Sequence, residues 1–105
     1  MGDAAETRPA EVFVVSDGTG ETATGAVRAA MLQFRTQWRM RTFADVRHPG
    51  QVGRILELAQ RERALVVFTV VDAGVAATLR ATGTEMGVPT VDLLGPLLTR
   101  VAQHV

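Results

Sequence analysis

The sequence predicts an α/β fold in which a four-stranded parallel sheet is flanked by helices. Four segments with the composition of strands alternate strictly with four segments of helical periodicity, which is typical of parallel sheets with right-handed crossovers. One strand segment, residues 64–71 (ALVVFTVV), is apolar throughout, as central strands covered on both faces are. With 105 residues, 47% of them hydrophobic, the chain has the size and composition of one globular domain.

The segment VFVVSDGTGET, residues 12–22, contains the first predicted strand, a turn and the start of the first predicted helix. β-Branched and aromatic residues predict a buried strand over 12–16, and the small polar residues after it predict a turn over 17–20. An alanine-rich helix is expected from Glu21 to Phe34. Its predicted inner face, at helical spacing, consists of Ala23, Ala26, Val27, Ala30, Met31 and Phe34.

The second strand is expected over residues 38–46, where side chains alternate between two faces. The face that carries Arg39 and Arg41 indicates a half-exposed strand at a sheet edge, and an anion-binding role for these arginines is the less favoured interpretation. His48 and Pro49 open the second helix, and His48 is expected to serve in a turn or cap. The apolar stripe of this helix is Val52, Ile55, Leu56 and Ala59.

Asp72 follows the apolar strand directly, at the place where an open α/β sheet has its ligand crevice. It also precedes a helical pattern, so helix capping is the favoured interpretation of its carboxylate. Gly83 suggests that this third helix is weak or bent toward its end, and Gly87 suits a left-handed stop. The inner face of the helix is expected to contain Val75, Leu79 and Met86.

The last strand and helix are predicted over residues 88–91 and 93–103, with Asp92 as the cap between them. Leu94, Leu97, Leu98 and Val101 give this helix a strongly apolar face that requires a cover. Four strand–helix units of this kind predict a Rossmann-like or flavodoxin-like three-layer arrangement. Residues 11–105 form the expected domain, and the polar residues 1–10 form an expected disordered tail.

The composition excludes several kinds of site. Eleven basic residues balance eleven acidic ones, so no electrostatic footprint for nucleic acid or an anionic membrane is expected. All the basic residues are arginine, which excludes a lysine base and the lysine of a P-loop from this sequence. Cysteine is absent, and no metal site is expected. Residues 1–10 do not resemble a signal peptide, and nothing spans a bilayer, so the expected compartment is the cytoplasm.

The glycine turn is the principal candidate site, because a strand, a glycine turn and a helix N-terminus together favour an anion. We expect glycine backbone and hydroxyl groups to bind phosphate here, from Ser16, Gly18, Thr19, Gly20 and Thr22. Asp17 and Asp72 are weak catalytic candidates, and Asp17 could serve as a base or as a partner for a cation. Glu21 is unfavourable for phosphate binding at this turn, since its negative charge would repel a phosphate.

Three other interpretations of the turn remain open. Gly18-x-Gly20-x-x-Ala23 fits a dinucleotide fingerprint, with Asp45 as a possible ribose ligand. The segment 19–22 (TGET) looks like the phosphate loop of flavodoxins, which bind FMN. The simplest interpretation is a tight turn with hydroxyl caps.

Three blocks carry a resemblance to a known family: VVSDGTGETA at 14–23, ALVVFTVVD at 64–72 and VPTVDLLGPLL at 88–98. They resemble, in order and spacing, the amino-terminal domain of the regulatory proteins of phosphoenolpyruvate synthase and pyruvate, phosphate dikinase. The resemblance implies a bifunctional serine/threonine kinase and phosphorylase that phosphorylates a threonine of its target with ADP. The phosphate is removed by phosphorolysis, which produces pyrophosphate.

In that family the P-loop that binds ADP lies in a second domain, so the resemblance implies ADP and phosphate through that domain. No cofactor is expected in the present chain itself, and it is not expected to be catalytic alone. The expected partners are pyruvate, phosphate dikinase or phosphoenolpyruvate synthase, together with the second domain or a second copy packed on the Leu94–Val101 face. The alternatives are an interaction or dimerisation module and a flavodoxin-like domain that binds a phosphate-bearing ligand.

Overall fold

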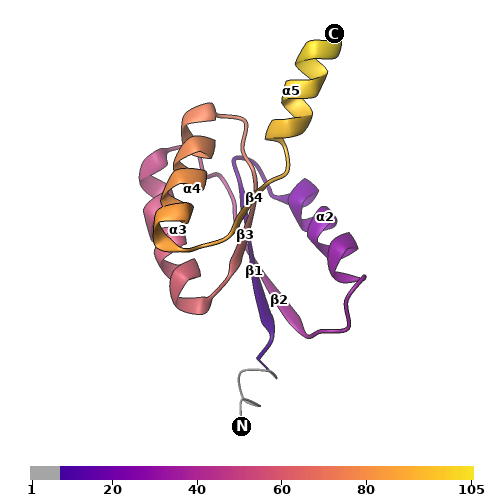
Figure 1. Ribbon diagram of the computed structural model, residues 1–105, viewed down its shortest axis with the longest axis vertical. Helices are drawn as coiled ribbons and strands as arrows, with labels where there is room; N and C mark the ends of the chain where they lie inside the picture. The colour runs from indigo at the N-terminus through magenta and orange to yellow at the C-terminus, as the bar shows by residue number, and fades with distance from the viewer. Residues whose placement is uncertain (1–7) are drawn as a thin grey trace.

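The computed structural model describes residues 8–105 and contains one four-stranded sheet (Figure 1). Its strands are β1 (Ala10–Ser16), β2 (Trp38–Phe43), β3 (Leu65–Thr69) and β4 (Thr90–Asp92). They lie in the order β2-β1-β3-β4, and every neighbouring pair is parallel. The predicted α/β class with a four-stranded parallel sheet is therefore confirmed, with the apolar strand β3 in the interior of the sheet.

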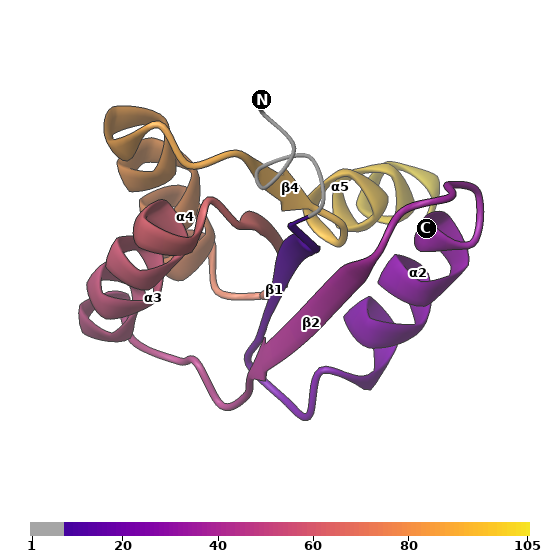
Figure 2. The ribbon, with the colours of Figure 1, turned by 90° about the horizontal axis from the view of Figure 1, so that it is seen from below.

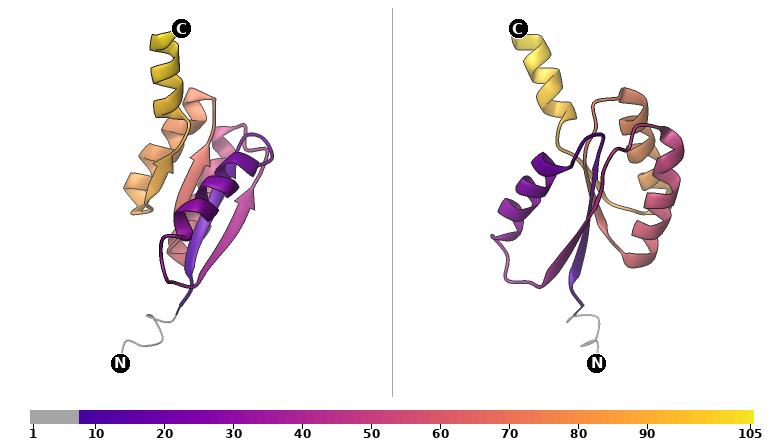
Figure 3. Two further views of the ribbon diagram at one scale, coloured as in Figure 1. Left: turned by 90° about the vertical axis from the view of Figure 1, so that its right-hand side faces the viewer. Right: turned by 180° about the vertical axis from the view of Figure 1, so that it is seen from behind.

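Three helices cover the sheet and one extends away from it. Helix α2 (Glu21–Met31) lies on one face, while α3 (Pro49–Glu62) and α4 (Ala73–Met86) lie on the other (Figures 1 and 2). Helix α5 (Gly95–His104) projects beyond the carboxyl ends of the strands (Figure 3). The three layers place the β1–α2 turn at the carboxyl edge of the sheet.

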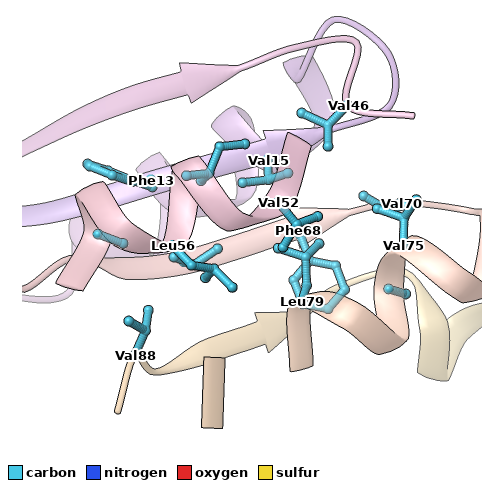
Figure 4. Packing of buried hydrophobic residues seen from close by; sticks show 14 of the residues in the cluster. Phe13, Val15, Val46, Val52, Leu56, Phe68, Val70, Val75, Leu79 and Val88 are labelled. Carbon is cyan, nitrogen blue, oxygen red and sulfur yellow. The ribbon is translucent and has the colours of Figure 1, made fainter. Parts of the chain in front are cut away.

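The larger part of the core lies between the sheet and the α3–α4 layer. Phe13, Leu56 and Phe68 are fully buried there and pack with valines from both layers (Figure 4). The smaller part lies under α2, where the buried residues are Val12, Val14, Ala23, Val27 and Val67. Continuous apolar strands with helices on both faces explain this two-sided core.

The second strand lies at the sheet edge, as its alternating pattern predicts. Both of its arginines contact side chains of the same chain. Arg39 forms an ion pair with Glu11 of β1. The Arg41 guanidinium lies 5.1 Å from the centroid of the Phe43 ring. These contacts support the solvated-edge interpretation over an anion site.

Several predicted boundaries and roles differ from the structure. Helix α2 ends at Met31, so Phe34 is not on its inner face and is 65% exposed. Helix α4 stays helical past Gly83 as far as Met86. A Cβ at Gly83 would lie 2.7 Å from Thr90 Cγ2, so this glycine permits close packing of α4 against β4.

The last helix begins later than predicted, and Asp92 is not its N-cap. Asp92 ends β4, and α5 starts at Gly95 after the cap residue Leu94. Leu93 continues the sheet pairing, since its N–H donates to Phe68 O at 3.1 Å. The Asp92 carboxylate Oδ1 instead accepts from the N–H groups of Leu94 and Gly95, at 3.1 and 2.8 Å.

Residues 1–7 of the predicted tail lie outside the described residues, and strand β1 already begins at Ala10. Within residues 8–105, none of the helices combines the length and apolarity that crossing a membrane requires.

Candidate functional site

The predicted glycine turn lines a cavity of about 300 Å³ at the carboxyl edge of the sheet. The cavity contains all five predicted phosphate-binding residues, together with Asp17. The complete lining is Ser16, Asp17, Gly18, Thr19, Gly20, Glu21, Thr22, Thr69 and Leu94. This is the position where open α/β sheets bind their ligands.

Gly20 fixes the geometry of the turn. It is the N-cap of α2 and has a φ of 89°, a left-handed conformation that favours glycine. A Cβ at this position would also lie 2.8 Å from Thr42 Cγ2 on the neighbouring strand. Gly18 is less constrained, because its added Cβ would meet only Ser16 Oγ, at 3.9 Å.

Two of the predicted hydroxyl ligands already make hydrogen bonds within the turn. Ser16 Oγ accepts from Gly18 N at 3.0 Å, and Thr19 Oγ1 accepts from Glu21 N at 3.4 Å. The Thr19 hydroxyl also donates to Glu21 Oε2 at 3.3 Å. These bonds agree with the interpretation of the segment as a hydroxyl-stabilised turn, and a phosphate would have to replace some of them.

Other donors at the N-terminus of α2 are not used in this way. No described residue hydrogen-bonds with the Thr22 hydroxyl, and the first turn of a helix leaves backbone N–H groups without intrahelical acceptors. The helix dipole adds partial positive charge at this end. The phosphate-binding assignment therefore remains a prediction, supported by the position of the cavity.

Asp17 connects the turn to the loop after β3. Its carboxylate Oδ2 accepts from Val71 N at 2.9 Å, across 54 residues of sequence. Asp72, the next residue, caps α4 by accepting from Val75 N at 2.9 Å and does not line the cavity. The favoured capping interpretation of Asp72 is confirmed, and a catalytic role for either carboxylate stays a prediction.

The structure adds neighbours that the sequence analysis did not assign to this site. Thr69, the last residue of β3, and Leu94 complete the cavity lining. Arg47 Nε donates to Asp17 O at 3.2 Å, which brings a cation to the turn that carries Asp17 and Glu21. The sequence places Thr69 inside the apolar segment 64–71, so both the end of β3 at Thr69 and the approach of Arg47 become visible only in the fold.

One contact supports the dinucleotide interpretation. Asp45 N donates to Gly18 O at 3.0 Å, which places Asp45 beside the turn. The Asp45 carboxylate lies 3.4 Å from Arg47 Nη2.

No contact supports the flavin interpretation, because no aromatic side chain lines the cavity. Trp38 pairs with Ala10 at the opposite end of the sheet. Residues 8–105 also contain no group of three metal-ligating side chains.

Comparison with known proteins identifies close sequence relatives. Residues 12–105 match the model of a family described as kinase/pyrophosphorylase. A pyruvate, phosphate dikinase regulatory protein from Sorangium cellulosum is 43% identical over 91 residues, covering 86% of this chain and 32% of that protein. The like-named protein of Rhodospirillum rubrum is 38% identical over 97 residues, with 87% and 34% covered.

A third relative, from Listeria monocytogenes, is 39% identical over 98 residues and named pyruvate, phosphate dikinase regulatory protein 1. The alignment covers 92% of this chain and 35% of that relative. The chain thus spans about a third of the length of the curated relatives that it matches.

Proposed function

The chain belongs to the kinase/pyrophosphorylase family, and we propose that it forms the amino-terminal part of a regulatory protein acting on pyruvate, phosphate dikinase or phosphoenolpyruvate synthase. The observation that carries the proposal is the family match over residues 12–105, together with the names of the relatives. A cytoplasmic location belongs to the same proposal.

The proposed whole protein catalyses two reactions at one threonine of its target. In the kinase direction the threonine hydroxyl attacks the β-phosphorus of ADP, the bridging P–O bond breaks, and AMP leaves. In the phosphorylase direction inorganic phosphate attacks the phosphothreonine phosphorus, and the threonine hydroxyl and pyrophosphate are released. Both directions require cationic groups near the transferred phosphoryl group.

The 105 residues contain no lysine, so they do not fit a P-loop for ADP. We therefore place the ADP site in the part of the relatives that this chain does not span. The proposed contribution of the present domain is to position the target or a phosphate at the Ser16–Thr22 turn. The support for this role is the cavity of about 300 Å³ at the N-terminus of α2.

The first test is a transfer assay with ADP labelled at the β-phosphate and purified pyruvate, phosphate dikinase. We expect no labelled dikinase with residues 1–105 alone, and labelled dikinase with the full-length Sorangium cellulosum relative as the positive control. Robust labelling by the 105-residue chain would contradict the placement of the ADP site elsewhere.

The second test addresses the turn directly. Thr19→Val combined with Thr22→Val removes two hydroxyl groups from the cavity, and both positions are exposed, so the fold should be retained. Titration with inorganic phosphate, followed by amide chemical shifts, should show binding to the natural chain and a loss of at least about tenfold in affinity in the variant. Unchanged phosphate affinity would show that the segment is only a turn.

An interaction module is the second candidate, and one observation favours it. Leu97, Leu98 and Val101 of α5 are 58%, 43% and 45% exposed, so the Leu94–Val101 face is only partly covered in the described chain. A second domain or a second copy would bury this face. The flavin-binding alternative has no comparable support.

A further inference from the structure

We infer that the loop between β2 and α3, residues 44–48, holds the peptide groups of the glycine turn so that their N–H groups face the cavity, and that Arg47 is a positioning residue of this site. The inference deepens the proposed function and rests on it, since it concerns phosphate binding at the same turn. Arg47 does not line the cavity and acts through the backbone of Asp17.

Three successive carbonyl groups of the turn accept hydrogen bonds from this loop. They belong to Ser16, Asp17 and Gly18. The first and the third accept from the backbone N–H groups of Val46 and Asp45, at 2.9 and 3.0 Å. The middle carbonyl accepts from Arg47 Nε at 3.2 Å. Because this contact comes from a side chain, a substitution can remove it while the two backbone contacts remain.

These hydrogen bonds determine which way the amide groups of the turn point. In a planar trans peptide, the C=O of one residue and the N–H of the next point in opposite directions, and the described chain contains no cis peptide bond. Donors from the loop on Asp17 O and Gly18 O therefore direct Gly18 N and Thr19 N away from the loop. In agreement with this orientation, Gly18 N donates to Ser16 Oγ at 3.0 Å.

The loop and the cavity lie on opposite sides of the turn. Val46 of the loop belongs to the core between the sheet and the α3–α4 layer (Figure 4). The cavity is lined by Ser16 and Thr69. Each stands two residues after a member of the smaller core under α2, Val14 and Val67, so it shares their face of the sheet. Amide groups that point away from the loop thus face the cavity, where an anion can accept hydrogen bonds from them.

Gln51 of α3 holds the loop in its turn. Its Oε1 accepts from Arg47 N at 2.8 Å and from His48 N at 3.0 Å, and its Nε2 donates to Asp45 O at 3.4 Å. Asp45 has a φ of 55°, in the left-handed region that is uncommon for residues other than glycine. Such a backbone conformation persists where surrounding contacts hold it. The contacts of Gln51 and the turn therefore keep the loop in one position against the site.

The test compares Arg47→Gln with Arg47→Met, two variants of equal charge. The amide nitrogen of glutamine is as many bonds from Cα as arginine Nε, so Arg47→Gln keeps a donor for Asp17 O, whereas Arg47→Met places a methyl group there. We expect the affinity for inorganic phosphate to be at least about fivefold lower in Arg47→Met than in Arg47→Gln. The carbon chemical shift of the Asp17 carbonyl and the proton shift of the Thr19 amide should depart from the natural chain further in Arg47→Met.

Arg54→Met is the control, since Arg54 is an exposed arginine of α3, and it should leave both shifts unchanged. The Arg47 side chain is 66% exposed, so circular dichroism should show the natural fold in all three variants. Equal phosphate affinities together with equal shifts in Arg47→Met and Arg47→Gln would overturn the inference. A natural chain that binds no inorganic phosphate would instead contradict the proposed function, and the Asp17 and Thr19 shifts would still decide whether Arg47 orients the turn.

Discussion

Asp17 shows how a single side chain can hold two loops of the candidate site together. Its carboxylate joins the β1–α2 turn to Val71, the residue before the α4 cap. Arg47 binds the backbone oxygen of the same residue, so three loops meet at Asp17. A side chain used in this way positions the cavity walls, whether or not it also takes part in proton transfer.

We expect Asp17→Ala to lower the free energy of unfolding by about 1–2 kcal/mol, because the Val71 N–H loses a charged acceptor. Urea denaturation monitored by circular dichroism measures the change. Glu85→Ala is the control, since Glu85 is an exposed carboxylate on α4 without a hydrogen bond to the rest of the described chain. Equal losses in the two variants would show that the Asp17–Val71 contact contributes nothing to stability.

At the scale of the helices, two interior glycines, Gly53 and Gly83, differ in the space that surrounds them. Gly53 in α3 is exposed and its Cβ would meet nothing within 4 Å. Gly83 in α4 is buried, and its Cβ would lie 2.7 Å from Thr90 Cγ2 and 3.2 Å from Val88 O. Propensity alone makes both positions unfavourable for a helix, and only packing distinguishes them.

Gly53→Ala should therefore raise the free energy of unfolding by about 0.5–1 kcal/mol, through helix propensity and a less flexible unfolded chain. Gly83→Ala should lower it by about 1–3 kcal/mol, because β4 must move away from α4. Thermal unfolding of both variants under one condition gives the comparison. Stabilisation by Gly83→Ala would mean that α4 and β4 are not in close contact in solution.

At the scale of the whole molecule, the core and the last helix are independent. The buried residues come from the sheet and from α2, α3 and α4, together with the loops that join them, while α5 contributes none. We therefore expect the arrangement of α5 to contribute little to the stability of the single domain.

Deletion of residues 97–105 should change the free energy of unfolding by less than about 0.5 kcal/mol. The deletion leaves Asp92 and its hydrogen bonds in place and removes only exposed residues. Urea denaturation provides the measurement. A loss of more than about 2 kcal/mol would indicate that α5 packs against its own domain in solution.

Much of the fold follows from local sequence pattern. The alternation of strand and helix segments, the continuous apolarity of residues 64–71 and the charged face of residues 38–43 predict the class, the interior strand and the edge strand. Glycines and hydroxyl residues at 16–22 predict the turn at the sheet edge. These features are local because hydrophobic period and turn chemistry act within a few residues.

Tertiary structure alone decided which interpretation of several residues holds. Gly83 packs closely, Asp92 ends a strand, Asp17 binds Val71, and Arg47 reaches the glycine turn, each through a neighbour distant in sequence. Local pattern is enough to show that the Leu94–Val101 face is apolar, whereas only the fold shows that Leu97, Leu98 and Val101 stay about half exposed. Burial and close approach depend on how distant segments pack, and local pattern carries no information about that packing.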